Sequence, residues 1–183
     1  MSVLNIEFKA TTNKLEELEA LLQQHNSLFI GEDHQVDTYF NMNSHPPQSF
    51  GGQAGRLKLR EGNIENALIH YEREDTAGVK ASHVLLYHHK PDKALKEILI
   101  KTLGIKAIVD KRRRIYFIDN VKFHFDTVDG LGTFVEVEAI DKDGTMGKEK
   151  LQVQCNQYAA LFGIRAEDYC PASYSDMILQ TSE

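Results

Sequence analysis

The stretch GTFVEVEAI, residues 132–140, decides the fold prediction because it places two acidic residues two positions apart in a β-strand pattern. Side chains alternate across a strand, so Glu136 and Glu138 point to one face while Val135 and Val137 point to the other. The rise of a strand puts the two carboxylates roughly 7 Å apart. Two negative charges on one face repel each other unless a positive charge lies nearby, so a cation or a basic side chain is expected opposite them.

The same alternation recurs in other predicted strands. RLKLR (56–60) alternates cations with leucines, and VKFHFD (121–126) alternates polar with apolar residues. DKRRRIY (110–116) carries cations on both faces, with 111 and 113 on one side and 112 and 114 on the other. Arg56, Lys58 and Arg60 thus share one face of their strand, and Lys122, His124 and Asp126 share one face of theirs.

The remaining pattern predicts an α+β domain in which neighbouring strands pair as antiparallel hairpins. Asn13 and Asp92 are expected to cap the first two helices, and Gly104 and Gly163 to follow helix ends. NSHPPQSFGGQAG (43–55) is expected to be a long loop. The expected strands are 3–10, 35–41, 55–62, 67–75, 80–89, 109–118, 121–128 and 133–140, and the expected helices are 13–25, 91–104, 148–162 and a short one within 174–180.

An ordinary half-exposed sheet would explain any one of these strands. Taken together, the central strands carry mainly cations, whereas the acids concentrate in the first strand and the last two. If the apolar faces look outward to helices, the charged faces line the lumen of a closed or nearly closed barrel. Unpaired buried cations would be costly, so the lumen is expected to hold a phosphate chain, with Mg²⁺ or Mn²⁺ between it and the carboxylates.

Composition limits the other options. The chain has 183 residues, a formal net charge of −6 and two cysteines, and its N-terminus lacks the pattern of a signal peptide. These features predict one domain over residues 1–183, a cytoplasmic location, and no binding to nucleic acid or membrane.

Several motifs resemble the CYTH superfamily, also called triphosphate tunnel metalloenzymes. They are NIEFKA, LKLRE, the arginine of HYERED, the lysine of VKAS, KRRRIYF, FDTVDGLG and FVEVEA, in the family's order. VDGLGTFVEVEA and the chain length look most like the class IV adenylyl cyclase branch. One position departs from the family's Glu-x-Glu-x-Lys signature, because Asn5 stands where the first glutamate is usual.

The resemblance implies an antiparallel eight-stranded β-barrel with a polar lumen and helices packed outside, and it assigns roles to residues inside that tunnel. It implies metal binding by Glu7, Asp126, Glu136 and Glu138, and catalytic roles for Lys9, Arg113 and Glu136. The implied substrate-binding residues are Lys9, Lys58, Arg60, Arg73, Lys80, Lys111 and Arg113.

Three functions remain open at this point. A cyclase would convert ATP to cyclic AMP and pyrophosphate, whereas a hydrolase would act on tripolyphosphate or thiamine triphosphate. A non-catalytic polyphosphate- or nucleotide-binding module is kept because of Asn5, and a homodimer is left open. His124 is read either as an acid or base in the lumen or as a polar side chain that fills its wall.

Overall fold

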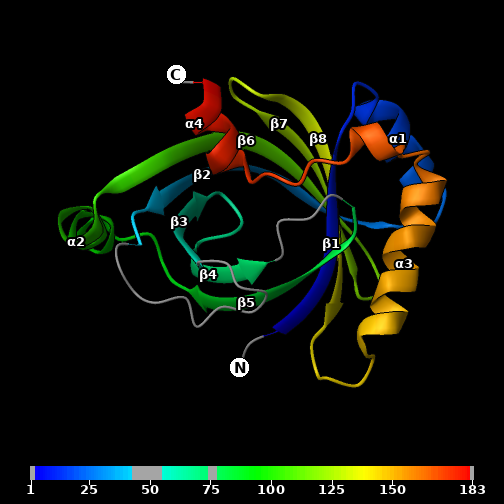
Figure 1. The fold of residues 1–183 in the computed structure, drawn as a ribbon, viewed down its shortest axis with the longest axis horizontal. Helices are drawn as coiled ribbons and strands as arrows, with labels where there is room; N and C mark the ends of the chain where they lie inside the picture. Colours follow the sequence, from blue (N-terminus) through cyan, green and yellow to red (C-terminus); the bar gives the residue numbers. More distant parts are fainter. Residues whose placement is uncertain (1–2, 43–54, 74–77, 182–183) are drawn as a thin grey trace.

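The computed structural model describes residues 3–42, 55–73 and 78–181, including the backbone but not the side chains of Val3 and Arg73. The predicted loop at 43–55 therefore lies almost wholly outside the described residues. Eight strands form a closed antiparallel barrel in the order β1-β5-β4-β3-β2-β6-β7-β8, which confirms the predicted fold class (Figure 1). The strands are β1 (Val3–Thr11), β2 (Leu28–Phe40), β3 (Arg56–Gly62), β4 (Ala67–Arg73), β5 (Lys80–His88), β6 (Ile105–Ile118), β7 (Val121–Val128) and β8 (Gly132–Asp141).

Two helices cover one flank of the barrel, as the apolar outer faces of the strands require. α1 (Leu15–Gln23) and α3 (Lys148–Leu161) pack beside β1 and β8 (Figure 1). Between them and the sheet lies a core that includes the fully buried Phe123, Val137 and Leu151. This arrangement leaves the opposite side chains of β1, β7 and β8 facing the lumen.

The helix α2 (Lys93–Leu103) departs from the expectation that its apolar face covers the sheet, because none of its residues is buried. Its predicted ends are confirmed. The carboxylate of Asp92 accepts a hydrogen bond from the Ala94 backbone amide at 2.7 Å. Gly104 follows the helix with a positive φ of 71°, a backbone conformation that glycine adopts readily.

Several predicted boundaries are wrong. The strand β6 begins at Ile105, four residues before the predicted start at 109. The cap of α1 is Lys14 rather than Asn13, and it makes no side-chain cap hydrogen bond. The strand β2 begins at Leu28, seven residues before the predicted start at 35, because it pairs along almost its whole length with β6. Because β2 begins earlier than predicted, it includes Asp33, a buried acid that was not among the predicted polar residues of the barrel.

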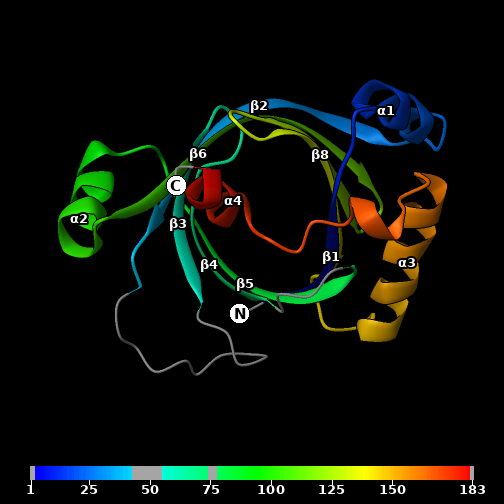
Figure 2. The same cartoon turned by 45° about the horizontal axis from the view of Figure 1, so that its top comes forward.

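The last helix, α4 (Tyr174–Thr181), lies across one end of the barrel (Figure 2). Its first residue, Tyr174, is buried in a cluster with Tyr71, Val109 and Phe134, which lie on strands of the barrel. Aromatic and apolar side chains therefore fill part of the lumen beside α4.

Candidate active site

The register of neighbouring strands brings the predicted acids and cations together. Glu7 of β1 lies opposite Glu138 of β8, and Lys9 lies opposite Glu136. On the other side of β8, Lys122 pairs with Glu138 and His124 pairs with Glu136. Directly opposed residues in an antiparallel pair point to the same face, so all of these side chains reach the lumen.

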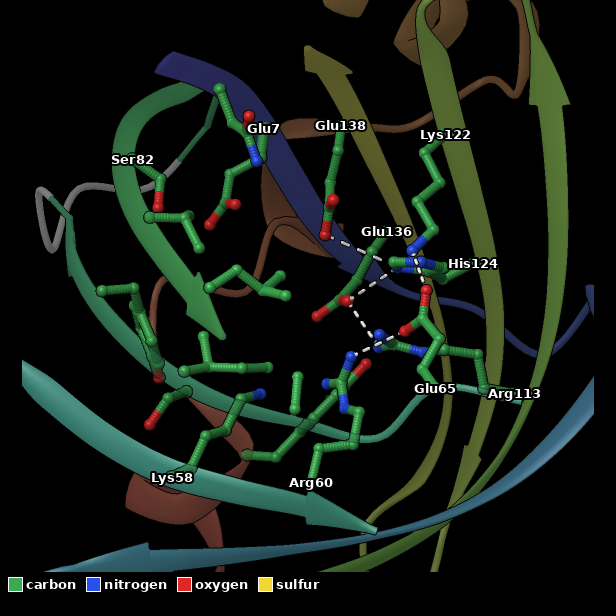
Figure 3. Close-up of a pocket in the computed structure, with 18 of the residues that line it drawn as sticks. Glu7, Lys58, Arg60, Glu65, Ser82, Arg113, Lys122, His124, Glu136 and Glu138 are labelled. Carbon is green, nitrogen blue, oxygen red and sulfur yellow. Dashed lines mark hydrogen bonds and ion pairs between the residues drawn. The ribbon is translucent and has the colours of Figure 1, made fainter. Parts of the chain in front are cut away.

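Three of the lumen side chains form a group that could hold a metal ion. One ligand atom from each of His124, Glu136 and Glu138 lies within 4.8 Å of the others (Figure 3). His124 Nδ1 is 3.4 Å from Glu136 Oε2 and 3.6 Å from Glu138 Oε1. Two carboxylates and an imidazole are a donor set that suits Mn²⁺ and other divalent transition metals.

The two glutamates differ in their electrostatic surroundings. Burial and the charges of Glu7 and Glu136 raise the pKa of Glu138 to about 7, although Lys122 opposes this shift. Burial disfavours the charged form of Glu136, but Arg113, His124 and Lys9 together outweigh burial and hold the pKa of Glu136 well below its usual value. Burial and the charges of Arg113 and Lys122 lower the pKa of His124 to about 3, so its imidazole is neutral at neutral pH.

A second group gathers three predicted phosphate-binding cations around one carboxylate that the sequence analysis missed. Asp37 of β2 is fully buried and accepts hydrogen bonds from Lys58 at 2.9 Å, Arg60 at 2.8 Å and Lys111 at 2.6 Å. Burial disfavours its charged form, but Arg60, Lys111 and Lys58 together hold the pKa of Asp37 well below its usual value. The premise that these cations lack partners is therefore wrong.

Glu65, between β3 and β4, is another acid that the sequence analysis missed. It accepts hydrogen bonds from Arg60 at 3.0 Å and from Lys122. The buried Asp33 carboxylate holds this turn by accepting from the backbone amide of Glu65 at 2.9 Å. Gly62 permits that approach, because a Cβ at this position would lie 2.7 Å from Asp33 Oδ1.

Arg113 is held by acids on two strands. Its Nε donates to Asp126 Oδ1 at 2.7 Å, and its Nη2 donates to Glu136 Oε2 at 2.6 Å. The hydroxyl of Tyr174 donates to Asp126 Oδ2 at 2.8 Å. Arg113 thus links Asp126, implied to be a metal ligand, to Glu136, and Asp126 is not among the three residues of the possible metal-binding group.

The remaining predicted substrate-binding residues are Lys9, Lys80 and Arg73. Lys9 is buried, with its ammonium 4.1 Å from the centre of the Tyr174 ring. Lys80 is buried and donates to the carbonyl oxygen of Pro171 at 3.0 Å. Arg73 is the last residue of β4, and its side chain lies outside the part of the chain that the structure describes.

A cavity of about 160 Å³ runs between these groups. Its polar lining includes Asn5, Glu7, Lys9, Lys58, Arg60, Glu65, Ser82, Lys111, Arg113, Lys122, His124, Glu136 and Glu138 (Figure 3). Within the described residues, Asn5 Oδ1 and His124 Nε2 are buried without a hydrogen-bond partner. Buried polar atoms of this kind are normally satisfied, which indicates room for a ligand or water beside them.

The sequence carried a signal for one of the missed acids. Asp33, Gln35, Asp37 and Tyr39 alternate in DHQVDTY, but the predicted strand began too late to include the first of them. Glu65 carried no such signal, since it belongs to a turn. Tyr174 also could not be placed, because its position depends on how α4 closes the barrel.

The chain belongs to the CYTH domain family, whose model matches residues 4–167. No curated protein matches the chain. Within the described residues, none of the helices combines the length and apolar character needed to cross a bilayer.

Solved structures share the fold over almost the whole chain. PH1012 from Pyrococcus horikoshii OT3 has a TM-score of 0.74 at 22% identity, with 96% of this chain and 98% of that chain covered. A candidate adenylate cyclase from Vibrio parahaemolyticus has a TM-score of 0.74 at 18% identity, covering 98% and 99% of the two chains. The candidate adenylyl cyclase HpAC1 from Hippeastrum, described as having a dominant triphosphatase activity, has a TM-score of 0.58 at 15% identity, covering 98% and 95%.

Proposed function

We propose that this protein is a divalent-metal-dependent enzyme that acts on a triphosphate substrate in the barrel lumen, and that it converts ATP to cyclic AMP and pyrophosphate. The observation that carries the proposal is that one cavity is lined by both the metal-binding group and several cations. The cyclase branch rests on the resemblance of VDGLGTFVEVEA and on the fold shared with a candidate adenylate cyclase.

In this proposal, Glu136, Glu138 and His124 hold Mg²⁺ or Mn²⁺, with Glu7 beside them. The donor set fits a divalent ion, and the imidazole favours Mn²⁺ over Mg²⁺. The bound ion would supply neutralising charge for the phosphate oxygens. Asp126 acts differently from the first expectation: it holds Arg113 in place, because it accepts that residue's hydrogen bonds.

The cations bind and orient the triphosphate. Lys9 and Arg113 line the cavity next to Glu136 and are proposed to be the catalytic cations, which stabilise negative charge on the reacting phosphates. Lys58, Arg60 and Lys111 bind farther along the phosphate chain, where Asp37 keeps all three charges in a fixed arrangement. Lys80 and Arg73 are proposed to contact the phosphate chain as well.

The cyclisation needs no nucleophilic side chain. The ribose 3′-oxygen forms a bond to the α-phosphorus, the bond from that phosphorus to the bridging oxygen breaks, and pyrophosphate leaves. The hydroxyl proton passes to solvent. The protein contributes by positioning the triphosphate and by stabilising charge, which are the dominant contributions in phosphoryl transfer.

Hydrolysis is the second candidate. The fold shared with HpAC1, a protein described as having a dominant triphosphatase activity, favours hydrolysis. Thiamine triphosphate or tripolyphosphate would then be the substrate. Asn5, which brings no negative charge to the lumen, also keeps a non-catalytic binding module in consideration. We also propose a cytoplasmic location, with which the free cysteines Cys155 and Cys170 are consistent, and a single domain over residues 1–183.

Product analysis tests the proposal. The purified protein is incubated with Mn²⁺ or Mg²⁺ and with ATP, thiamine triphosphate or tripolyphosphate in parallel, and products are separated by anion exchange. Equal amounts of cyclic AMP and pyrophosphate from ATP are expected. If orthophosphate is the main product, the protein is a hydrolase rather than a cyclase. If none of the three substrates gives a product, the proposed enzymatic role is overturned.

A further inference from the structure

The lining of the cavity is not charged all round. The β-ladder between β4 and β5 places Ile69 opposite Leu86 and Ala67 opposite His88. Ala67, Ile69, Val84 and Leu86 all line the same cavity as the metal-binding group, and we call these four residues the apolar wall. The wall contains no charged side chain.

Exposure changes along the apolar wall. Ala67 and Ile69 belong to a buried hydrophobic cluster, and Val84 packs partly against it. Leu86 is 49% exposed although it lines the cavity. The wall therefore extends from the packed interior to the open part of the cavity, where apolar surface is left in contact with solvent.

Charged groups lie both beside the apolar wall and across the cavity from it. In the ladder between β3 and β4, Lys58 pairs with Ile69 and Arg60 pairs with Ala67. Ser82 of β5 and Lys58 of β3 lie on the side opposite Lys122 and His124 (Figure 3). The cavity therefore combines an uncharged surface, which has Lys58 and Arg60 next to it, with Lys122 and His124 on its other side. Small-molecule sites commonly combine an apolar surface with a few placed polar groups, and the apolar surface receives the organic part of the ligand.

We propose that the apolar wall binds the organic group of a triphosphate ester, so that this protein selects organic triphosphates over inorganic tripolyphosphate. The inference rests on the proposed function and deepens it, because the phosphate chain must first bind to the charged groups of the cavity. Inorganic tripolyphosphate is charged along its whole length and gains nothing from the wall. An ester bearing an aromatic ring covers Leu86 and Val84 and removes their surface from water.

Two adjacent leucines provide a matched test. Leu86 lines the cavity, whereas its neighbour Leu85 points to the opposite face of β5, and both are 49% exposed. Leu86→Ser removes an apolar side chain from the apolar wall, and Leu85→Ser removes the same kind of side chain from the outside of the barrel. Because both side chains are half exposed, neither substitution leaves a buried cavity.

The experiment measures binding of ATP, thiamine triphosphate and tripolyphosphate by calorimetry in the presence of Ca²⁺, with chromatography to verify that each ligand stays intact. At least one ester should bind about tenfold or more tightly than tripolyphosphate, as expected for a buried hydrophobic contact. Leu86→Ser should reduce that ratio several-fold, and Leu85→Ser should leave it unchanged.

Two results would count against the proposal in different ways. Tripolyphosphate binding at least as tightly as both esters, or the same ratio in the two serine variants, would overturn the apolar wall while leaving a triphosphate site intact. No binding of any of the three ligands would overturn the proposed function together with this inference.

Discussion

The hydroxyl of Tyr174 donates a hydrogen bond to Asp126 Oδ2 at 2.8 Å, which links the last helix to the interior of the barrel. Asp126 also accepts a hydrogen bond from Arg113, and Arg113 in turn donates to Glu136. A residue near the end of the chain thus completes a hydrogen-bonded series that ends at the proposed metal-binding group. The position of α4 is therefore coupled to the geometry of the site.

The first prediction concerns Tyr174→Phe, which removes this hydroxyl and little else. We expect the free energy of unfolding to fall by about 1 kcal/mol, the usual contribution of one hydrogen bond. Because Asp126 would hold Arg113 less firmly, kcat should fall more than KM rises. Denaturant unfolding and steady-state kinetics measure the two effects.

Tyr169→Phe is the matched control, since the Tyr169 ring packs edge-on against Phe8 in the core between the sheet and the helices. Its kinetics should stay at the wild-type level. If Tyr174→Phe has wild-type kinetics as well, α4 has no part in positioning Arg113.

The second prediction concerns Asp37→Asn. Removing the negative charge leaves Lys58, Arg60 and Lys111 close together without their common partner. Breaking a buried ion pair from one side typically costs about 3–5 kcal/mol, so the free energy of unfolding should fall by that order. Tripolyphosphate should raise the melting temperature of this variant more than that of the wild type, because it replaces the lost negative charge.

Asp110→Asn is the control for Asp37→Asn. Asp110 pairs with His34 on the surface, where both side chains are about half exposed, and an exposed pair contributes about 0–1 kcal/mol. A wild-type melting temperature for Asp37→Asn would contradict the role given to Asp37.

The third prediction separates the two glutamates by their effect on stability in the absence of metal. The pKa of Glu138 is about 7 in the folded protein, against an ordinary value of 4.5. Between these values the folded state binds more protons than the unfolded state, so Glu138 lowers stability as pH rises from about 4.5 to 7. Glu138→Gln should therefore raise the melting temperature at pH 8 and have little effect near pH 4.

Glu136→Gln should do the opposite at pH 8. The pKa of Glu136 is held well below its usual value beside Arg113, so its charged form stabilises the folded state at neutral and alkaline pH. That contribution is lost only as pH falls through the low folded-state pKa. Equal melting-temperature shifts for the two variants at pH 8 would contradict this electrostatic description.

Much of the barrel could be predicted from alternation alone. The period-two pattern placed Lys111 and Arg113 together on one face, and the family resemblance assigned that face to the lumen. Both residues are buried there, while Arg112 is exposed on the outside. Asp37 was missed because acids were expected only in the first strand and the last two, whereas the central strands were interpreted as cationic.

Other parts of the site depend on tertiary structure that alternation does not encode. Tyr174 reaches Asp126 across 48 residues of sequence, and Glu65 enters from a turn held by Asp33. The position of the apolar wall next to charged groups also depends on the register of β3, β4 and β5. In the sequence, Ile69 and Leu86 look like any apolar strand residues, and only the strand register shows that they lie beside a cavity.

The central claim is that Glu136, Glu138 and His124 hold a divalent metal ion opposite the cations of the lumen. Titration with Mn²⁺, followed by the electron paramagnetic resonance signal of the free ion, tests this without turnover. The account predicts saturable Mn²⁺ binding by the wild type that is lost in Glu136→Gln and Glu138→Gln and weakened in His124→Gln, with all three variants folded. Unchanged Mn²⁺ binding in the two folded glutamine variants at positions 136 and 138 would contradict it.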